Sequence, residues 1–481
     1  MNHLKSVVIG LSLSVAATVT ATNLPDIGDT SGAVVSPELE RRMGEAFIRQ
    51  IRRVAVIIDD PEVQEYVDAL GHRLASHRSE SRQDFYFFVV DDPTINAFAA
   101  PGGYVGLHTG LFLSSRSESE LASVLAHEIA HVTQRHMART FERAGQLSLP
   151  LAAAMLGAAL LGLQNPEAAQ AAFAAVMAGS QQYQINFTRA NEQEADRIGM
   201  ELLAAAGFDP RGMPSFFERL QIANRLNDPK NFPEFLRTHP VTVTRIADSR
   251  NRAEQLPSRD YKDSLPYHLV RAKLLVAAAT DPVEAVKHYE ALMRSGGYKD
   301  ENVARYGYAL ALTKAGEYGK ASVQVQRLIT GDHPPLAYLL AAARLTIADQ
   351  RVDEGLGIYA KALQSYPDSR PIMLGYADAL LDANRGAQAR KLLRQYTKHH
   401  EPDIAYYTLL AEAEGRAGSV VESHMALAEV YYLNGETARA QDQLRIAQKI
   451  EPMSNYHRER VDARLKELQK ELDEEKKLRG V

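Results

Sequence analysis

Residues 121–136 read LASVLAHEIAHVTQRH and place three histidines and a glutamate in an apolar run. On an α-helix, residues four apart lie on the same face, so His127 and His131 can present their imidazoles to one metal ion. Glu128 is rotated by about 100° from His127, which places its carboxylate near a water on that ion rather than among the ligands. His136 follows nine residues after His127, on about the opposite face of a continuous helix, so we expect a surface or helix-C-terminal histidine and not a ligand.

A catalytic zinc needs a third protein ligand beside an open position, and a second segment can supply it. The segment NFTRANEQEADRIGMELL (186–203) reads as a helix on which Glu192 and Asp196 share a face while Glu194 points elsewhere. We expect Glu192 to be the third ligand and Asp196 to accept the free ring N–H of a ligating histidine. The alternative is an exposed acidic helix whose neighbouring arginines are its partners.

The composition narrows the kinds of site and partner. The chain contains no cysteine, so a zinc site must use His, Asp and Glu, and disulfides are excluded. With 481 residues, 45% of them hydrophobic, the chain is long enough for two or three folded domains. The formal net charge of −5 is small and no run of five or more Lys or Arg occurs, so we expect no nucleic-acid partner.

The amino-terminal end has the features of a secretory signal. Lys5 precedes an apolar run over residues 7–19, and small residues follow up to Ala21. We therefore expect residues 1–21 to be a cleaved signal peptide, and an exported protein without disulfides fits the bacterial periplasm. The alternative is an uncleaved anchor, although the apolar core is shorter than the ~20 residues of a spanning helix.

Apolar periodicity predicts helices over residues 37–77 and 117–139, the second of which contains HEIAH. Between them, segments 84–92, 95–103 and 104–112 are rich in aromatic and β-branched residues and are broken by Asp-Asp-Pro and Pro-Gly-Gly. These segments predict a small β-meander. The site helix thus follows a short sheet.

An apolar stretch over residues 147–178 has two interpretations. It forms either a membrane hairpin or a pair of helices that pack over the preceding domain as a mobile lid. Alanine and glycine dominate it, and Pro150 interrupts its first part, which is shorter than a usual spanning helix.

From about residue 266 the chain reads as a row of helix pairs. Turn markers recur about every 34 residues, at Asp281-Pro282, Gly316, Asp349-Gln350, Arg385-Gly386 and Gly418. The pattern resembles tetratricopeptide repeats, best seen in RYGYALALTKAGEYGKA (305–321) and IMLGYADALLDANRGAQA (372–389). An unrelated helical bundle is the alternative, because the tryptophan of the repeat consensus is missing. We expect a mostly α protein whose residues 261–481 form an α-solenoid, with the charged helix 458–479 as its cap.

HEIAH, the downstream NEQEAD and the segment NAFAAPGGYVGLHTGLF (96–112) together resemble the HtpX and CAAX prenyl protease group of gluzincin metallopeptidases. With a signal in front and repeats behind, the chain resembles a periplasmic branch of this family from end to end. The resemblance implies a zincin-like metallopeptidase domain over residues 22–260. One zinc ion per chain would be bound by His127, His131 and Glu192, the first glutamate of the ExxxD pattern.

The resemblance also points to THPVTVTRI (238–246), which is similar to the family's histidine loop. It implies that His239 is either a fourth zinc ligand that holds the resting enzyme closed or a group that stabilises the transition state after leaving the metal. A His-Pro turn residue without such a role is the alternative. Arg245 is a weaker candidate for the transition-state role.

Glu128 is expected to act as the general base, taking a proton from the attacking water and returning it to the leaving amine. An extended substrate would lie along the strand near Asn96 and Phe98 as an added edge strand, where backbone hydrogen bonding requires no particular sequence.

The resemblance further implies partners and a cellular role. The protein would degrade misassembled outer-membrane β-barrel proteins and, with a chaperone-like activity, promote their assembly, contacting the assembly machinery through its repeats. Peripheral membrane association stays open. The alternatives are a repeat-based chaperone or adaptor with a structural or vestigial zinc site, and a membrane-embedded protease. Glu128 argues against a structural site, which has no use for a base beside its ligands.

Overall fold

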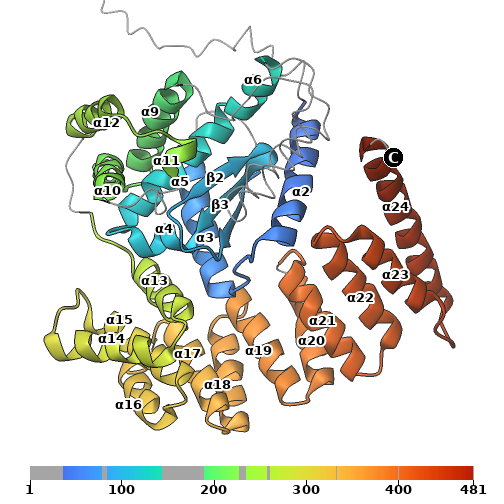
Figure 1. Ribbon diagram of the computed structural model, residues 1–481. Coiled ribbons are helices and arrows are strands. Elements are labelled where there is room, and N and C mark those ends of the chain that lie inside the picture. Colours follow the sequence, from blue (N-terminus) through green and yellow to red (C-terminus); the bar gives the residue numbers. More distant parts are fainter. Residues whose placement is uncertain are drawn as a thin grey trace, which may run out of the picture.

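The computed structural model describes residues 36–77, 84–143, 189–226, 235–256, 261–331, 333–398 and 400–479. The expected signal peptide and the apolar stretch 147–178 lie outside these residues. Within them, no helix combines the length and hydropathy needed to cross a membrane. The described chain is predominantly helical with one small sheet, which confirms the predicted fold class (Figure 1).

Two helices open the amino-terminal part: α2 (Pro37–Val54) and α3 (Pro61–Ala75). Each begins with a proline at its first position, preceded by a capping side chain. Ser36 accepts a hydrogen bond from a backbone N–H of α2, and Asp60 accepts from two backbone N–H groups of α3. Such caps satisfy amide groups that have no partner inside the helix.

The three strands are β1 (Tyr86–Val90), β2 (Ala97–Ala100) and β3 (Tyr104–His108). All three predicted strand segments form, but their order is β1-β3-β2, with β1 and β3 parallel, so the expected meander was wrong. A meander would place β2 between its sequence neighbours. Instead β3, whose Val105 and Leu107 are fully buried, takes the centre, and β2 is left as an edge strand.

The parallel pairing is fixed by polar contacts at the ends of β1 and β3. The Thr109 hydroxyl and the Gly110 N–H both donate to the carbonyl oxygen of Asp92, at 2.8 and 2.9 Å. These bonds join the residues that follow the two strands. Between β1 and β3 the chain crosses to the opposite edge of the sheet, forms β2 and returns as the central strand. Sequence periodicity contains no signal for such a crossing.

Short α4 (Thr109–Ser114) leads to α5 (Glu118–Thr133), the central helix of the amino-terminal part. Nearly all of α5 is buried, and α6 (His136–Arg143) follows it after a break. The described chain continues with α9 (Arg189–Ala205), α10 (Gly212–Leu226), α11 (Phe235–Thr238) and α12 (Val243–Gln255).

The remaining helices pair into a curved row that runs beneath the amino-terminal part in Figure 1. In chain order they are α13 (Leu265–Ala278), α14 (Pro282–Ser295), α15 (Glu301–Lys314), α16 (Tyr318–Leu328), α17 (Leu336–Ala348), α18 (Val352–Ser365), α19 (Arg370–Asp382), α20 (Gly386–Tyr396), α21 (Ile404–Arg416), α22 (Val420–Leu433), α23 (Thr437–Gln448) and α24 (Asn455–Arg479). Positive φ angles at Gly316, Gln350, Asn384 and Gly418 mark turns within these pairs. The left-handed backbone closes each helix and reverses the chain.

The first repeat helix, α13, belongs to two hydrophobic cores. Its Tyr267, Val270 and Leu274 pack into the core of the amino-terminal part, whereas Leu269 and Val276 pack into the core of the first repeats. The two parts of the chain therefore share one helix rather than a linker.

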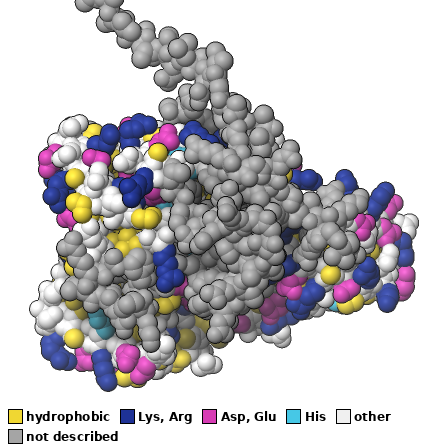
Figure 2. All heavy atoms as spheres, turned by 45° about the horizontal axis from the view of Figure 1, so that its top comes forward, with side chains coloured by type: hydrophobic (Ala, Val, Ile, Leu, Met, Phe, Trp, Pro, Cys, Tyr) yellow, Lys and Arg dark blue, Asp and Glu magenta, His cyan; other side chains and the backbone are white. Residues whose placement is uncertain are grey.

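Charged contacts join the repeats to α3 of the amino-terminal part. Lys273 lies 2.6 Å from Asp60 and also pairs with Glu62, whose Oε2 lies 2.7 Å from Arg344 on α17. At the far end of the row, the guanidinium of Arg49 on α2 lies over the ring of Tyr432. The inner side of the row is thus partly occupied by the chain's own amino-terminal part (Figure 1). On the face drawn in Figure 2, acidic and basic side chains alternate over the described surface.

Candidate metal centre

Helix α5 presents two imidazoles to a common point. Nε2 of His127 and Nε2 of His131 lie 3.0 Å apart, and both side chains are buried. Ser117 caps the helix by accepting a hydrogen bond from the N–H of Glu120. The four-residue spacing therefore brings both rings to one side of a rigid, capped helix.

Helix α9 brings a carboxylate to the same point. Glu192 Oε2 lies 3.5 Å from Nε2 of His127, and Oε1 lies 3.4 Å from Nε2 of His131. The two helices approach closely because Gly199 faces the backbone of α5, where an added Cβ would lie 3.0 Å from the backbone nitrogen of His127. A small residue on α9 thus determines how near Glu192 comes to the histidines.

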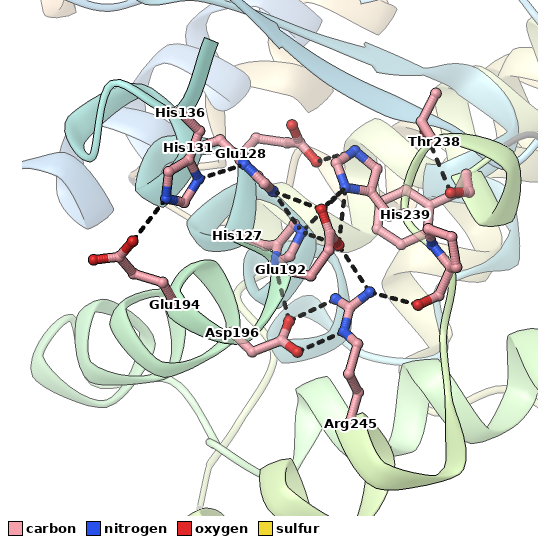
Figure 3. A network of polar contacts seen from close by, with 12 residues as sticks. His127, Glu128, His131, His136, Glu192, Glu194, Asp196, Thr238, His239 and Arg245 are labelled. Carbon is pink, nitrogen blue, oxygen red and sulfur yellow. Dashed lines mark hydrogen bonds and ion pairs between the residues drawn. The ribbon is translucent and has the colours of Figure 1, made fainter. Parts of the chain in front are cut away.

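The loop between α11 and α12 contributes the fourth group. Nδ1 of His239 lies 3.0 Å from Glu192 Oε1 and 3.4 Å from His127 Nε2. The His239 ring is stacked on Phe235, and its backbone N–H donates to the carbonyl of that residue. His239 therefore lies in a fixed position, with its ring directed into the cluster (Figure 3).

These four side chains fit a metal ion. One potential ligand atom from each of His127, His131, Glu192 and His239 lies within 4.8 Å of the others, and all four residues are buried. Burying imidazoles and a carboxylate this closely is costly unless a cation or protons bridge them. Two histidines, a carboxylate and a further donor form a set typical of catalytic metal sites.

The electrostatics of the pocket favour positive charge at its centre. Burial alone lowers the pKa of His127, but hydrogen bonds from its ring to the carboxylates of Asp196 and Glu192 outweigh burial and raise the pKa to about 9. Burial also tends to raise the pKa of Glu192, yet the surrounding imidazoles lower it strongly. Burial lowers the pKa of His131 well below the usual value. A divalent cation supplies the positive charge that this arrangement favours.

Asp196 and Arg245 lie beneath the cluster. Oδ1 of Asp196 lies 3.0 Å from Nδ1 of His127, the nitrogen that faces away from the other imidazoles. Arg245 donates to both oxygens of Asp196 at 2.7 Å, and its Nη1 lies 2.8 Å from Glu192 Oε2. The guanidinium is committed to these two carboxylates, which supports a positioning role for Arg245 in place of the oxyanion role considered from the sequence.

Glu128 has the environment of a group held ready for proton transfer. Its side chain is buried, and neither carboxylate oxygen has a hydrogen-bond partner in the described part of the chain. Oε1 lies 3.5 Å from Nε2 of His239, and Figure 3 shows the two groups facing each other. Burial raises the pKa of Glu128. A carboxylate in such a position can accept a proton from a nearby water.

His136 is buried rather than exposed, so the expectation of a surface histidine was wrong. That expectation assumed a continuous helix, but α5 ends at Thr133 and Arg135 adopts a left-handed backbone with φ of 52°. The break turns His136 back towards the site, where its Nδ1 lies 2.8 Å from Nδ1 of His131. Its Nε2 lies 3.0 Å from Glu194 Oε2, on the side of His131 away from the cluster (Figure 3).

The edge strand β2 lies next to the histidine loop. The N–H of Phe235 donates to the carbonyl of Ile95, just before Asn96 and β2. Asn96 is buried, and Phe98 packs against Phe47 and Phe88 on the face of the sheet turned to α2. The Phe98 ring thus points away from the metal cluster, and what β2 can offer a peptide is its backbone.

Known proteins share these features. A model of peptidase family M48 matches residues 61–253, and a tetratricopeptide-repeat model matches residues 346–413. The putative beta-barrel assembly-enhancing protease of Vibrio cholerae is 39% identical over 448 residues, which cover 92% of each chain. The beta-barrel assembly-enhancing protease of Escherichia coli is 36% identical over 451 residues, or 93% of this chain and 91% of its own.

A more distant relative matches a smaller part. The mitochondrial metalloendopeptidase OMA1 of Arabidopsis thaliana is 31% identical over 186 residues, or 38% of this chain and 35% of its own. The peptidase match includes every residue of the buried cluster, and the two bacterial relatives extend over the repeats as well. The chain is therefore a metallopeptidase and belongs to the family of the beta-barrel assembly-enhancing proteases.

Proposed function

We propose that this protein is a zinc-dependent endopeptidase of the periplasm that degrades misassembled outer-membrane β-barrel proteins and promotes their assembly. The single observation that carries the peptidase chemistry is a buried cluster of His127, His131, Glu192 and His239 beside a carboxylate, Glu128, without a hydrogen-bond partner among the described residues. A structural site would have no use for such a base.

His127, His131 and Glu192 would bind the zinc ion. A bound zinc supplies Lewis acidity, which activates water and polarises a peptide carbonyl. Glu128 accepts the proton of the attacking water on a carboxylate oxygen and delivers it to the leaving nitrogen. Because burial raises the pKa of Glu128, its protonated form is accessible between these two transfers.

The surrounding side chains orient these groups. Oδ1 of Asp196 lies 3.0 Å from Nδ1 of His127 and would accept the N–H of that nitrogen, which leaves Nε2 of the ring to face the metal. Arg245 holds Asp196 and Glu192 in place by pairing with both. His239 would be a fourth ligand at rest, and it would leave that position when a substrate binds or stabilise the transition state from nearby.

Substrate would bind by backbone pairing. Strand β2 lies at the edge of the sheet and close to the histidine loop, so an extended peptide can add to the sheet there. Side chains of Asn96 and Phe98 are directed into the protein and would not select a sequence. Main-chain recognition suits a protease that acts on unfolded chains of many sequences.

The proposed location and partners rest on the relatives and the repeats. Relatives of nearly equal length are named for enhancing β-barrel assembly, and a tetratricopeptide-repeat model matches residues 346–413. We propose that the repeats contact outer-membrane substrates and their assembly machinery. Residues 1–21 would direct export to the periplasm, where contact with a membrane would be peripheral.

The deciding experiment compares the wild type with Glu128→Gln, measuring bound zinc and cleavage of unfolded casein. We expect one zinc per chain in both proteins, and cleavage reduced by about 10²–10⁴-fold in the variant. Glu201→Gln, an exposed position on α9, serves as the matched control and should cleave normally. Equal cleavage by zinc-loaded wild type and Glu128→Gln would contradict the catalytic assignment.

A further inference from the structure

The two histidines of α5 each have a second ring nitrogen that faces away from the cluster. His127 directs its Nδ1 to the carboxylate of Asp196 at 3.0 Å. His131 directs its Nδ1 to another imidazole, Nδ1 of His136, at 2.8 Å, and the far nitrogen of that imidazole lies 3.0 Å from Glu194 Oε2. His127 and His131 are thus supported on different sides, one by a carboxylate and the other by an imidazole (Figure 3).

We propose that His136 and Glu194 form a hydrogen-bonded relay that positions His131 for metal binding. The inference rests on the proposed metal site, because it assigns an outer partner to one of its ligands. Neither residue touches the reacting atoms, so both are positioning residues. Their effect would be to fix the tautomer and the ring orientation of His131.

The proton positions follow from the metal. A histidine that binds a metal through Nε2 carries its proton on Nδ1. His131 therefore donates from Nδ1, and His136 must accept on its own Nδ1, because two N–H groups cannot face each other at 2.8 Å. A neutral His136 then carries its proton on Nε2, which donates to Glu194. This one assignment of protons gives His131, His136 and Glu194 each a matching donor or acceptor.

The local fold is built around this contact. His136 is fully buried, and the left-handed backbone at Arg135 turns it back towards α5. Arg135 is itself held by Glu40 of α2 at 2.8 Å. The resulting turn brings a residue just outside α5 into contact with a ring on that helix.

Glu194 is oriented from the other side. It lies two residues after Glu192 on α9, so one helix would supply both a ligand and the end of the relay. Arg139 on α6 lies 3.3 Å from Glu194 Oε2 and helps to hold the carboxylate against His136. Glu194 is about one-third exposed, with 32% of its side chain accessible, so substitution there leaves the core intact.

The relay predicts a graded effect on metal binding. Outer partners of metal ligands typically contribute about 10–100-fold to metal affinity. His136→Phe fills the space without an acceptor, and we expect zinc to bind about 10–100-fold more weakly. His136→Asn places an oxygen near the position of Nδ1 and should restore most of the affinity. Glu194→Gln keeps an acceptor but removes the charge, and it should give an intermediate loss.

The test uses the chain from residue 22 onwards, which contains both the peptidase part and the repeats. Zinc affinity and the rate of zinc loss to a chromogenic chelator are measured, together with the visible absorption of the Co²⁺-substituted protein. Glu201→Gln, exposed on the same helix, is the matched control and should behave as the wild type. Thermal unfolding of each variant establishes that it is folded.

The outcomes separate this inference from the proposed function. A wild type that binds no zinc would overturn the metal site itself. A wild type that binds zinc, with unchanged zinc release and Co²⁺ spectrum in Glu194→Gln and His136→Asn as well as in a folded His136→Phe, would overturn the relay alone. Weaker zinc binding in His136→Phe with recovery in His136→Asn would support the relay. If His136 only filled space, zinc affinity would not depend on whether the side chain at this position has a hydrogen-bond acceptor.

Discussion

Nε2 of His239 lies 3.5 Å from Oε1 of Glu128, while Nδ1 of the same ring lies 3.0 Å from Oε1 of Glu192. One imidazole therefore extends from Glu192 to Glu128. If a metal ion binds among these groups, a water in contact with both that ion and Glu128 would compete with the His239 ring for the same space. Access of water to the site would then depend on movement of His239.

Replacement of His239 by alanine tests this dependence. If the ring blocks the water position at rest, His239→Ala should raise the rate of casein cleavage while the remaining three ligands retain the zinc. The rate is measured at saturating zinc, and His288→Ala, an exposed histidine of the repeats, is the control. Unchanged or lost cleavage would favour a turn or transition-state role for His239.

Arg245 should be essential for keeping two buried carboxylates close together. Arg245→Met leaves Asp196 and Glu192 without their shared cation, and removing one partner of a buried pair typically costs about 3–5 kcal/mol. We expect a lower free energy of unfolding in denaturant, with partial recovery when zinc is added. Arg250→Met on the same helix breaks only an exposed pair and should cost under about 1 kcal/mol. Equal losses in the two variants would argue against the positioning role.

Gly199 should control the distance between the helices that supply the ligands. The Cβ of Gly199→Ala would press on the backbone of α5 near His127, and such overpacking typically costs about 1–3 kcal/mol. We expect a lower melting temperature and weaker zinc binding together, because Glu192 moves with α9. A variant that is destabilised but binds zinc normally would show that the helix spacing does not determine the site.

Glu62 should hold the repeats against the peptidase part. It is contacted by Lys273 of α13 and by Arg344 of α17, and its side chain is mostly buried. Glu62→Gln removes the countercharge of Arg344 and leaves Lys273 with Asp60 alone, so amide hydrogen exchange should speed up in α17 and, to a smaller extent, in α13. Glu354→Gln, which alters an exposed pair within α18, is the control and should leave exchange unchanged. If amide hydrogen exchange were unchanged in both variants, apolar packing alone would hold the repeats against the peptidase part.

Helix periodicity accounts for what the sequence predicted about the site. A spacing of four residues places His127 with His131, and Glu192 with Asp196, on shared faces, and the structure brings these faces together. The catalytic and metal-binding roles of these residues stay predictions. The same rule failed for His136, because a single left-handed residue, Arg135, breaks the helix that the rule assumed. An arginine carries no preference for that conformation that would have revealed the break.

The strand order and the contacts of the repeats were not predicted, because they depend on residues that are far apart in the sequence. Strand segments were recognised from their composition, but the order β1-β3-β2 depends on contacts between Asp92 and the residues after β3. Repeat turns were recognised because turn markers recur at an interval of about 34 residues. Neither pattern contains information about which repeats contact α3, since a periodic array looks alike along its length. The domain boundary near residue 260 stays a prediction.

The helix α13, which packs on both parts of the chain, limits how this protein can be divided. A peptidase ending near residue 260 would lack Tyr267, Val270 and Leu274, and burial of each such side chain typically contributes about 1.5–3 kcal/mol. A recombination event that replaced the repeat array with another would have to keep the face of α13 that packs on the peptidase. The array and the peptidase are therefore expected to be inherited together, as one cooperative folding unit.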